Sequence, residues 1–329
     1  MIQAKALVFR EANKPLLEEV EIPNLTANEI RVKTMYSGVS IGTESSIFSG
    51  VRTNNGTFPL VGGYMSSGVI QEIGLSVKGF ATGDQVIVNG SRLQGKVNSV
   101  WGAHMSIRIA DASTVVKVPE KVKMQEAAMF ILPNVGLNAV SMAGINEQDT
   151  VLIFGQGLIG QFFGQFAKNR GARIIAVEPN KIRSNLSRQY VTDFILDPFK
   201  DDIETEVERI TCGKGPSVVV EATASSKVLN TATRFLQRNG KMVFLSWYPG
   251  SISLNFADFH NNKIVAYFPM GAGNKETTHA TLKCLSDGSL IFGKNITDLI
   301  KYQNACEGYL RIIGGDKTIM GMVIDWRNA

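Results

Sequence analysis

A glycine-rich turn at residues 151–160, VLIFGQGLIG, constrains the fold of this chain more than any other feature. Gly155, Gly157 and Gly160 follow an apolar, strand-like run and open the helix-like segment LIGQFFGQFAKNRG, after which a second apolar run ends at Glu178. A strand, a tight turn, a helix and a second strand in this order form a βαβ unit, which requires parallel strands. The pattern therefore predicts a dinucleotide-binding α/β domain in the middle of the chain.

The residues that follow continue this alternation. The strand-like runs are RIIAVEP, DFILD, SVVVEAT, KMVFLSWYP and NKIVAYFPMG, and the helix-like segments between them are NKIRSNLSRQY, IETEVERITC and SKVLNTATRFLQRNG. Apolar strands that alternate with helices are typical of a doubly wound parallel sheet covered on both faces. Before this sheet, helical spacing over residues 124–143 predicts a helix that is interrupted near Pro133 and Gly136.

The first third of the chain has a different pattern. Short runs such as EIRVKTMYSG, SSGVIQEIG and HMSIRIADASTVVKVP alternate apolar and polar residues or cluster β-branched ones. Turn signals separate the runs at residues 13–15, 54–56 and 82–84. This part is predicted to be an antiparallel β domain with little helix. A helix-rich C-terminal segment ends in one more strand, TIMGMVIDW.

Composition limits the classes of function. The 329 residues suffice for two domains, and 44% hydrophobic with 19% charged residues is typical of a globular protein. The formal net charge is +5, but Lys and Arg are scattered. Without a basic block, neither a nucleic-acid partner nor a membrane-binding basic patch is expected. A small-molecule substrate fits better.

The cysteines and the apolar segments indicate the cellular compartment in which the protein is expected. Cys212, Cys284 and Cys306 are far apart and form no C-x-x-C pair, which favours a reduced, cytoplasmic setting over a disulfide framework. The N-terminus is predicted to be a strand rather than a signal peptide. The most apolar segment is shorter than a membrane span.

Each position of the glycine turn has a physical reason. Gly155 permits the tight turn, Gly157 leaves room for a pyrophosphate, and Gly160 lets the helix pack closely on the strand. The helix N-terminus offers N–H groups and the positive end of its dipole to the phosphates. The residues expected to contact the cofactor here are Gly155, Gln156, Gly157, Leu158, Ile159, Gly160, Glu178 and Pro179. The alternative is a plain βαβ unit with small residues at a crowded turn.

Glu178 bears on the choice between NAD and NADP. A carboxylate there can accept hydrogen bonds from the adenosine ribose and repels a 2′-phosphate, so NAD is preferred. Lys181 and Arg183 follow closely and provide the alternative, because two cations can hold that phosphate. They can equally be a solvated helix face.

A β-rich first domain before a dinucleotide-binding domain resembles the medium-chain dehydrogenase/reductase superfamily over nearly the whole chain. The resemblance rests on an ordered series: NEIRVKTMYSGVSIGTE, FPLVGGYMSSGVIQEIG, GDQVIV, VPEKVKMQEAAMFILPNVGLNAV, VLIFGQGLIG, RIIAVEPNKIR and VVVEATAS. It implies an α/β protein with a GroES-like, β-rich catalytic domain at 1–124, completed by 274–329, and a Rossmann dinucleotide-binding domain at 125–273.

The chain departs from the zinc-dependent members of this superfamily. At the position of their cysteine ligand this chain has Ser40. At the position of their G-H-E triplet it has Gly63-Tyr64-Met65, and in the region of their later ligand it has Asn134. Zinc prefers thiolate, imidazole or carboxylate ligands, so no metal is expected. The chain is most similar to the zinc-independent branch around the BchC-like bacteriochlorophyllide dehydrogenase and alcohol dehydrogenase-like proteins. The pigment as a substrate does not follow from this resemblance.

Hydroxyl groups at the vacated positions are the candidates for acid–base chemistry. Tyr64 is the best candidate for donor or acid, with simple packing as the alternative. Ser40 and Thr43 can relay a proton or cap a turn, and Glu44 can orient them or act as a helix-end acid. Met65 is assigned to the core or a pocket wall.

Of the three histidines, His104, on an expected strand of the first domain, is the one candidate to touch substrate. Trp101, three residues before it, can line an apolar pocket or anchor a surface loop. His260 and His279 are expected to be structural or exposed.

The resemblance also implies further cofactor contacts at the carboxyl ends of the strands. These are Ala222, Thr223, Ser246, Met270, Gly271 and Asn138. Ordinary strand-end turns are the alternative. The segment NFADFHNNKIVAYFPMG resembles the edge strand through which family members extend the sheet into a dimer, so a homodimer is expected.

The sequence thus predicts a zinc-independent NAD(P)-dependent oxidoreductase that acts on a ketone or secondary alcohol. One alternative is NAD(P)H-dependent reduction of an activated C=C bond in an enone or quinone. The other, from a different class, is an NAD(P)-binding sensor or scaffold without turnover.

Overall fold

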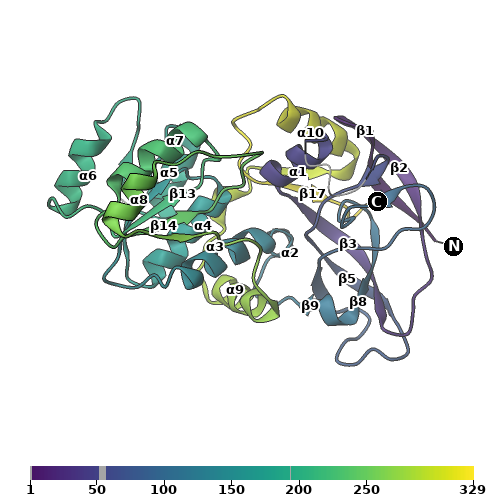
Figure 1. Ribbon diagram of the computed structural model, residues 1–329. Helices are drawn as coiled ribbons and strands as arrows, with labels where there is room; N and C mark the ends of the chain where they lie inside the picture. Colours follow the sequence, from purple (N-terminus) through teal and green to yellow (C-terminus); the bar gives the residue numbers. More distant parts are fainter. Residues whose placement is uncertain (1, 52–56, 193) are drawn as a thin grey trace. The chain divides into compact units, whose positions relative to one another are not determined.

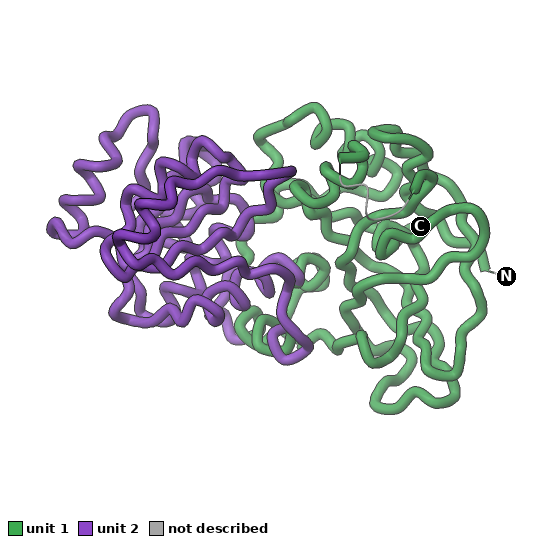
Figure 2. Tube along the Cα trace, viewed as in Figure 1, with its two compact units in different colours: residues 1–130, 278–286, 292–329 green, residues 131–277, 287–291 purple. Residues whose placement is uncertain are grey.

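The computed structural model describes residues 2–51, 57–192 and 194–329, and the chain divides into two compact units (Figure 2). The β-rich unit comprises residues 1–130, 278–286 and 292–329, and the parallel-sheet unit comprises residues 131–277 and 287–291. The turn predicted at residues 54–56 lies outside the described residues. Each unit is described below by itself.

The β-rich unit contains two sheets (Figure 1). The first has the strand order β2-β1-β4-β7, with β1 (Ile2–Glu11), β2 (Lys14–Ile22), β4 (Leu60–Val61) and β7 (Asn98–Ser99). The second has the order β16-β17-β3-β5-β6-β9, with β3 (Glu29–Val39), β5 (Ser66–Ile73), β6 (Gln85–Val88), β9 (Val116–Lys117), β16 (Asp298–Lys301) and β17 (Met322–Asp325), and β8 (Ile107–Asp111) also pairs with β3. Its helices are α1 (Ile41–Phe48), α2 (Met124–Ala127) and α10 (Ala305–Ile313), with 3-10 turns at Ala112–Thr114, Gly293–Asn295 and Tyr302–Asn304.

The C-terminal segment completes the sheet that the N-terminal segment begins. Strand β17 pairs antiparallel with β3, with Met322 opposite Val39. The same segment fills the core, because the buried cluster that holds Phe9 and Phe48 also holds Tyr309 and Trp326. The β-rich unit therefore takes its core from both ends of the chain.

The single strand expected over residues 104–119 is divided in the structure. Asp111 ends β8 because its side chain accepts a hydrogen bond from Ser113 N–H at 2.8 Å and caps a 3-10 turn before β9. His104 precedes β8 and lies in a bend, so its placement on a strand was wrong. Short polar caps of this kind interrupt a strand without changing its β-like composition.

The parallel-sheet unit has the predicted doubly wound fold (Figure 1). Its six strands lie in the order β12-β11-β10-β13-β14-β15, and every neighbouring pair is parallel. The strands are β10 (Thr150–Phe154), β11 (Arg173–Val177), β12 (Phe194–Leu196), β13 (Val218–Glu221), β14 (Lys241–Phe244) and β15 (Val265–Tyr267). The helices are α3 (Ile131–Met142), α4 (Leu158–Asn169), α5 (Lys181–Tyr190), α6 (Ile203–Thr211), α7 (Ser226–Ala232) and α8 (Phe256–Asn262), with a 3-10 turn at Thr233–Phe235; α9 (Lys275–Asp287) has residues in both units.

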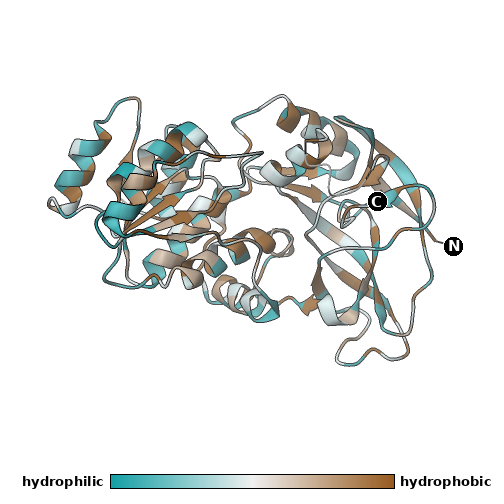
Figure 3. Cartoon of the chain, in the orientation of Figure 1, coloured by the Kyte–Doolittle hydropathy of each residue, from teal (hydrophilic) through white to brown (hydrophobic). Residues whose placement is uncertain are grey.

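Both faces of this sheet are covered by helices, which explains why its central strands are mostly apolar (Figure 3). On β10, Leu152 and Phe154 belong to the cluster that contains Val207 of α6 and Leu229 of α7. Ile153 faces the other way, because a Cβ added at Gly164 of α4 would lie 3.4 Å from its Cδ1. The carboxyl ends of the strands are thereby held in register at one edge of the sheet.

The helix predicted before this sheet is interrupted earlier than expected. It divides into α2 and α3, and Pro133 lies in the first turn of α3. A proline is tolerated there because a first-turn N–H has no acceptor within the helix. Gly136 stays helical, and a Cβ there would lie 2.8 Å from the backbone N of Phe163, so the glycine permits a close approach to α4.

No helix in the described part of the chain combines the length and the apolar composition that crossing a bilayer requires.

Candidate functional site

The glycine turn follows β10 and has the crowded geometry that its sequence predicts. Gly155 has φ of +91°, and a Cβ there would lie 2.8 Å from Thr223 Cγ2 and 2.9 Å from Ala222 O. A Cβ at Gly160 would lie 2.2 Å from the backbone oxygen of Gly155. Both positions therefore exclude any larger residue, since backbone atoms cannot move aside as a flexible side chain can.

Gly157 differs from these two glycines. A Cβ added there would meet no atom within 4 Å. Gly157 is the N-cap of α4, and no side chain hydrogen-bonds to the cap. The first-turn N–H groups of α4 thus face open space, the arrangement that binds a phosphate at a helix N-terminus.

Glu178 braces the glycine turn. The residue is 5% exposed and follows β11. Its Oε2 accepts a hydrogen bond from Gln156 N–H and its Oε1 one from Asn180 N–H, each at 2.8 Å. Each carboxylate oxygen keeps a second lone pair, so the braced side chain can still accept a bond from a ribose hydroxyl.

The other predicted residues near this turn differ in exposure: Gln156 is buried, Arg183 is half-buried and Lys181 is exposed. Gln156 is fully buried and accepts a hydrogen bond from Ser187 Oγ at 2.8 Å, so its side chain serves the protein interior. Lys181 and Arg183 lie in the first turn of α5, directly after Glu178 and Pro179. Lys181 is exposed, and Arg183 Nε is buried without a partner among the described residues.

The ends of β13 and β14 hold a cluster in which Thr223 and Ser246 were predicted from the sequence, whereas Glu221 and Tyr248 were not. Glu221 is fully buried; its Oε1 accepts bonds from Thr223 N–H, at 2.6 Å, and Thr223 Oγ1, and its Oε2 accepts one from Tyr248 Oη. Burial, and then the bond to Glu221, raises the pKa of Tyr248. Ser246 Oγ accepts a bond from Ala224 N–H at 2.9 Å. The only sequence signal was an acidic residue at the end of an apolar strand.

These contacts join several predicted cofactor residues into one edge of the sheet. Ala222 and Thr223 border Gly155, and Ser246 is bonded to the next residue, Ala224. Asn138 and Gly271 form a second group, since Asn138 Nδ2 donates to Gly271 O at 3.4 Å. Met270 beside them is 87% exposed.

In the β-rich unit, Glu44 is the centre of a buried hydrogen-bond network. Its Oε2 lies 2.7 Å from His104 Nε2 and accepts a bond from Tyr309 Oη, while its Oε1 accepts a bond from Ser40 N–H at 2.7 Å. Glu44 and Tyr309 are each 1% exposed and His104 is fully buried. In this structure Glu44 and His104 are therefore closed to direct contact with a substrate.

Among the predicted catalytic residues of this unit, Tyr64 and Thr43 are half-buried, whereas Ser40, Glu44 and His104 are buried. Its ring meets the Trp101 ring edge to face, with centroids 5.4 Å apart. The residue before it, Gly63, has φ of +79°, and a Cβ there would lie 2.5 Å from His104 Nε2. Glycine at position 63 thus lets the backbone that carries Tyr64 lie directly on the His104 ring.

Ser40 and Thr43 flank the network without closing it. Ser40 is the N-cap of α1, but its hydroxyl makes no capping bond. Thr43 directly precedes Glu44 in α1, and its carbonyl accepts a bond from Ser46 Oγ. The structure therefore brings together Ser40, Glu44 and His104, and leaves Thr43 beside them.

The side chains at the positions of zinc ligands do not fit that ion. Serine, tyrosine and asparagine occupy them, and Met65 is fully buried. Glu44 and His104 are suitable ligand types, but they are bonded directly to each other. Within residues 2–51, 57–192 and 194–329, no three side chains of His, Cys, Asp or Glu are grouped as a metal ion requires.

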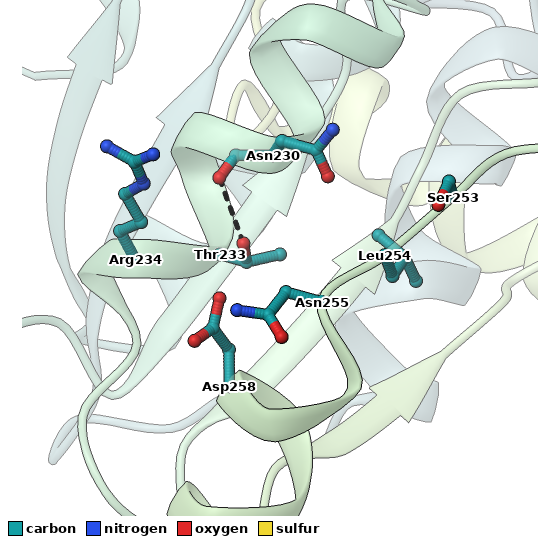
Figure 4. Close-up of a pocket in the computed structure, with 7 residues that line it drawn as sticks. All are labelled: Asn230, Thr233, Arg234, Ser253, Leu254, Asn255 and Asp258. Atoms are coloured by element: carbon teal, nitrogen blue, oxygen red, sulfur yellow. Dashed lines mark hydrogen bonds between the residues drawn. The ribbon is translucent and has the colours of Figure 1, made fainter.

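A shallow pocket of about 380 Å³ lies elsewhere on the parallel-sheet unit, beside α7 and the start of α8 (Figure 4). It is lined by Asn230, Thr233, Arg234, Ser253, Leu254, Asn255 and Asp258. Thr233 Oγ1 donates to Asn230 O at 3.1 Å, and the Asn255 side chain accepts a bond from Ala257 N–H. These groups serve their own helices, and none of the predicted site residues lines the pocket.

Comparison with protein families gives two matches. Residues 26–120 match the alcohol dehydrogenase GroES-like domain, and residues 159–287 match the family described as zinc-binding dehydrogenase. The first match covers the segment with Ser40, Glu44, Tyr64 and His104. The second begins within α4, after Gly155 and Gly157, and covers the strands β11 to β15.

Curated relatives and solved structures agree with these matches. The chain is 25% identical to L-threonine 3-dehydrogenase of Pyrococcus furiosus, with 92% of each chain covered. It is 26% identical to an alcohol dehydrogenase of Geobacillus stearothermophilus, with 97% of this chain and 98% of the relative covered. The crystal structure of 2R,3R-butanediol dehydrogenase from Bacillus subtilis has the same fold, with a TM-score of 0.85, 21% identity, and coverage of 98% of this chain and 99% of that chain.

Proposed function

This chain belongs to the medium-chain dehydrogenase/reductase superfamily and is an NAD(P)-dependent dehydrogenase, and from that premise we propose that it transfers hydride between nicotinamide and a ketone or secondary alcohol without zinc. The observation that carries the proposal is the set of side chains at the positions where zinc-dependent members hold their metal. Ser40, Tyr64 and Asn134 stand there, and none is a usual zinc ligand.

The absence of zinc ligands leaves a chemical task to other groups. When a ketone is reduced, negative charge develops on its oxygen, and a well-placed hydrogen-bond donor lowers the barrier by about 3–4 kcal/mol. We assign this donor to the Tyr64 hydroxyl, which is half-buried against Trp101. Ser40 and Thr43 are proposed as auxiliary hydroxyls, and Glu44 and His104 as the buried groups behind them.

The match to a family described as zinc-binding dehydrogenase does not oppose this proposal. That match begins at residue 159, after all of the positions at which a zinc ligand is expected. It therefore concerns the cofactor domain, whose fold is shared by members with and without a metal.

For the cofactor we propose NAD in preference to NADP. Glu178 is held in place by two backbone N–H groups, so its carboxylate cannot readily turn away from a 2′-phosphate. A fixed negative charge at that point opposes a second one. Lys181, which is exposed, and Arg183, which is half-buried, are the features that favour NADP instead.

We further propose that the protein is a homodimer that forms along β15. This strand is the edge of the parallel sheet, and its neighbourhood exposes apolar side chains: Val265 is 50% exposed and Phe268 is 62% exposed. An unpaired apolar edge strand is a template for pairing with another strand. Light scattering should give the mass of two chains, and the mass of one chain would contradict the proposal.

One assay tests the function, the metal and the cofactor together. Protein treated with a chelator should oxidise NADH in the presence of a panel of ketones, should yield alcohols, and should act less well with NADPH. Activity lost with the chelator and restored by zinc would refute the zinc-independent mechanism. A saturated ketone formed from an enone would instead favour reduction of a C=C bond.

The Tyr64→Phe variant tests the donor within the same assay. It keeps the ring against Trp101 and removes only the hydroxyl, so kcat should fall on the order of 100-fold while KM changes little. Trp101→Phe is the matched control, since it alters the same ring contact and removes no proposed donor. Unchanged turnover by Tyr64→Phe would remove Tyr64 from the mechanism.

A further inference from the structure

Arg108, on β8, is a fully buried arginine of the β-rich unit. Its Nη1 donates hydrogen bonds to Ser66 Oγ and to Val88 O, the latter at 3.0 Å, and its Nη2 donates to Gly90 O at 2.5 Å. Among the described residues no carboxylate is bonded to this guanidinium, and burial lowers the pKa of Arg108 to about 9. Burying a cation without an anionic partner is costly, so the contacts that it makes instead require a reason.

The oxygens that Arg108 binds belong to two segments, and each segment places one ring of an aromatic pair. Ser66 begins β5, two residues after Tyr64. Gly90 follows β6, and a Cβ there would lie 3.8 Å from Trp101 O. The Tyr64 and Trp101 rings meet edge to face, with centroids 5.4 Å apart. The guanidinium therefore joins the two segments whose aromatic side chains meet.

Residues 89–103 form most of the connection between β6 and β8 and are here called the β6–β8 loop. On one side Ser91 Oγ accepts a hydrogen bond from Ile109 N–H, next to the buried arginine, at 3.1 Å. At the end of the loop, Ala103 N–H donates to Gly63 O at 2.9 Å, directly before the proposed donor. The loop is thus bonded both to the strand of the arginine and to the backbone that carries the donor.

The ring of Trp101 is placed by a strained backbone. Trp101 has φ of +62° and Gly102 has φ of +63°. The left-handed conformation costs free energy for a bulky residue and persists only where surrounding contacts fix it. A Cβ at Gly102 would lie 2.6 Å from Ser99 Oγ, which itself donates to Ser91 O at 2.6 Å. The position of the Trp101 ring therefore depends on how firmly the β6–β8 loop is held.

The backbone that carries Tyr64 also rests on His104. A Cβ at Gly63 would lie 2.5 Å from His104 Nε2, so this backbone lies on the imidazole. His104 Nδ1 lies 2.9 Å from Ser37 Oγ, which accepts a bond from Trp326 Nε1–H at 2.8 Å. The imidazole is held without the buried arginine. A change at the arginine should consequently disturb the ring pair and leave this support in place.

We propose that Arg108 is a positioning residue, whose guanidinium holds the start of β5 and the β6–β8 loop together and so keeps the Tyr64 ring in a fixed orientation against Trp101. The inference rests on the proposed function, because this orientation matters for turnover only if the Tyr64 hydroxyl donates to the substrate oxygen. A rigid, planar fork of N–H donors suits the task, since it sets the relative positions of several acceptors at once.

Arg108→Met tests this role by removing the donors while keeping a long, unbranched side chain. In ketone reduction kcat should fall by roughly 10- to 100-fold, because a displacement of about 1 Å at the reacting group can cost that much. KM should change little. Arg108→Lys keeps donors without the fork and should restore part of kcat. Arg31→Met is the matched control and should retain wild-type kcat, because Arg31 lies on the neighbouring strand β3 and binds Glu72 instead.

Combination with Tyr64→Phe separates positioning from a general loss of structure. If the arginine acts through the Tyr64 hydroxyl, Arg108→Met should change kcat by less than about twofold once that hydroxyl is absent. Independent structural damage would instead multiply the two losses. Multiplied losses, or wild-type kcat in folded Arg108→Met, would overturn the inference.

Tryptophan fluorescence tests the arrangement of the rings without turnover. The chain has three tryptophans, so the emission of Trp101 is the difference between each protein and the same protein with Trp101→Phe. Acrylamide should quench this emission more strongly in Arg108→Met than in wild type, because the loop no longer holds the ring against Tyr64. Equal quenching in the two proteins would contradict the proposed role.

The outcomes distinguish this inference from the function on which it rests. If wild-type protein reduces no ketone, the proposed function fails, and quenching still decides whether Arg108 holds the ring pair. If ketones are reduced and Tyr64→Phe is as active as wild type, the inference is refuted while the function stands. If Arg108→Met does not fold, Ser66→Ala replaces it, since it removes one acceptor and keeps the guanidinium. Stronger quenching and a Tyr64-dependent loss of kcat in Ser66→Ala support the inference, and wild-type values refute it.

Discussion

Gly157→Asp is expected to remain folded and to lose the cofactor. A side chain at this position meets no atom within 4 Å, and an aspartate at the N-cap accepts bonds from the first-turn N–H groups of α4. Stability should therefore stay the same or rise by up to about 1 kcal/mol. The carboxylate, however, takes the place of the pyrophosphate and repels it, so the dissociation constant of NADH should rise on the order of 100-fold or more.

Fluorescence titration with NADH measures this change, and denaturation in urea measures the stability. Gly157→Asn is the matched control, because it has nearly the same shape, caps the helix and carries no charge. Its NADH affinity should lie between those of Gly157→Asp and wild type. Wild-type affinity in Gly157→Asp would show that the cofactor does not use this helix N-terminus.

Gly160→Ala should have the opposite effect and destabilise the fold before any ligand binds. The added Cβ would lie 2.2 Å from the backbone oxygen of Gly155, and only a movement of α4 away from the turn can relieve that overlap. Overpacking of this kind typically costs 1–3 kcal/mol, and the rigid partner places Gly160 at the upper end, about 3 kcal/mol.

Gly42→Ala is a suitable comparison for this second variant. Gly42 lies in α1, and a Cβ there meets no atom within 4 Å. Alanine in an unobstructed helical site should stabilise the protein by about 0.5–1 kcal/mol. Urea denaturation of both variants should thus give changes of opposite sign. Equal stability of Gly160→Ala and wild type would mean that the turn is looser than the structure has it.

The geometry of the glycine turn could be predicted from sequence because its physics is local. The three glycines, the flanking apolar strands and Glu178 lie within 28 residues, and each acts on its near neighbours. The doubly wound sheet followed from the same alternation of apolar strands and helices. The helix was expected to be interrupted near Pro133 and Gly136, but the interruption lies before Ile131. A proline in the first turn of a helix cannot be told from sequence apart from a proline that ends a helix.

The buried network in the β-rich unit could be predicted only in part. Ser40, Glu44 and His104 were candidates because of their residue types, but their mutual contacts depend on tertiary packing. Tyr309 lies 265 residues from Glu44 along the chain, and Trp326 lies 289 residues from Ser37. No periodicity or motif connects such distant positions, so neither residue could be linked to the site without the structure. The Glu221–Tyr248 pair was missed for another reason: the two residues belong to the ends of different strands, and only the pairing of β13 with β14 brings them together.

The pairing of β17 with β3 has a consequence for how the protein is made. The parallel-sheet unit is encoded almost entirely before residue 292, whereas the other unit waits for Trp326 and the strand before it. During synthesis the parallel-sheet unit can therefore fold before the β-rich unit is complete, while β3 remains without its partner β17. Removal of β17 and Trp326 would therefore take away few residues, but it would cost the β-rich unit both a sheet partner of β3 and a core side chain.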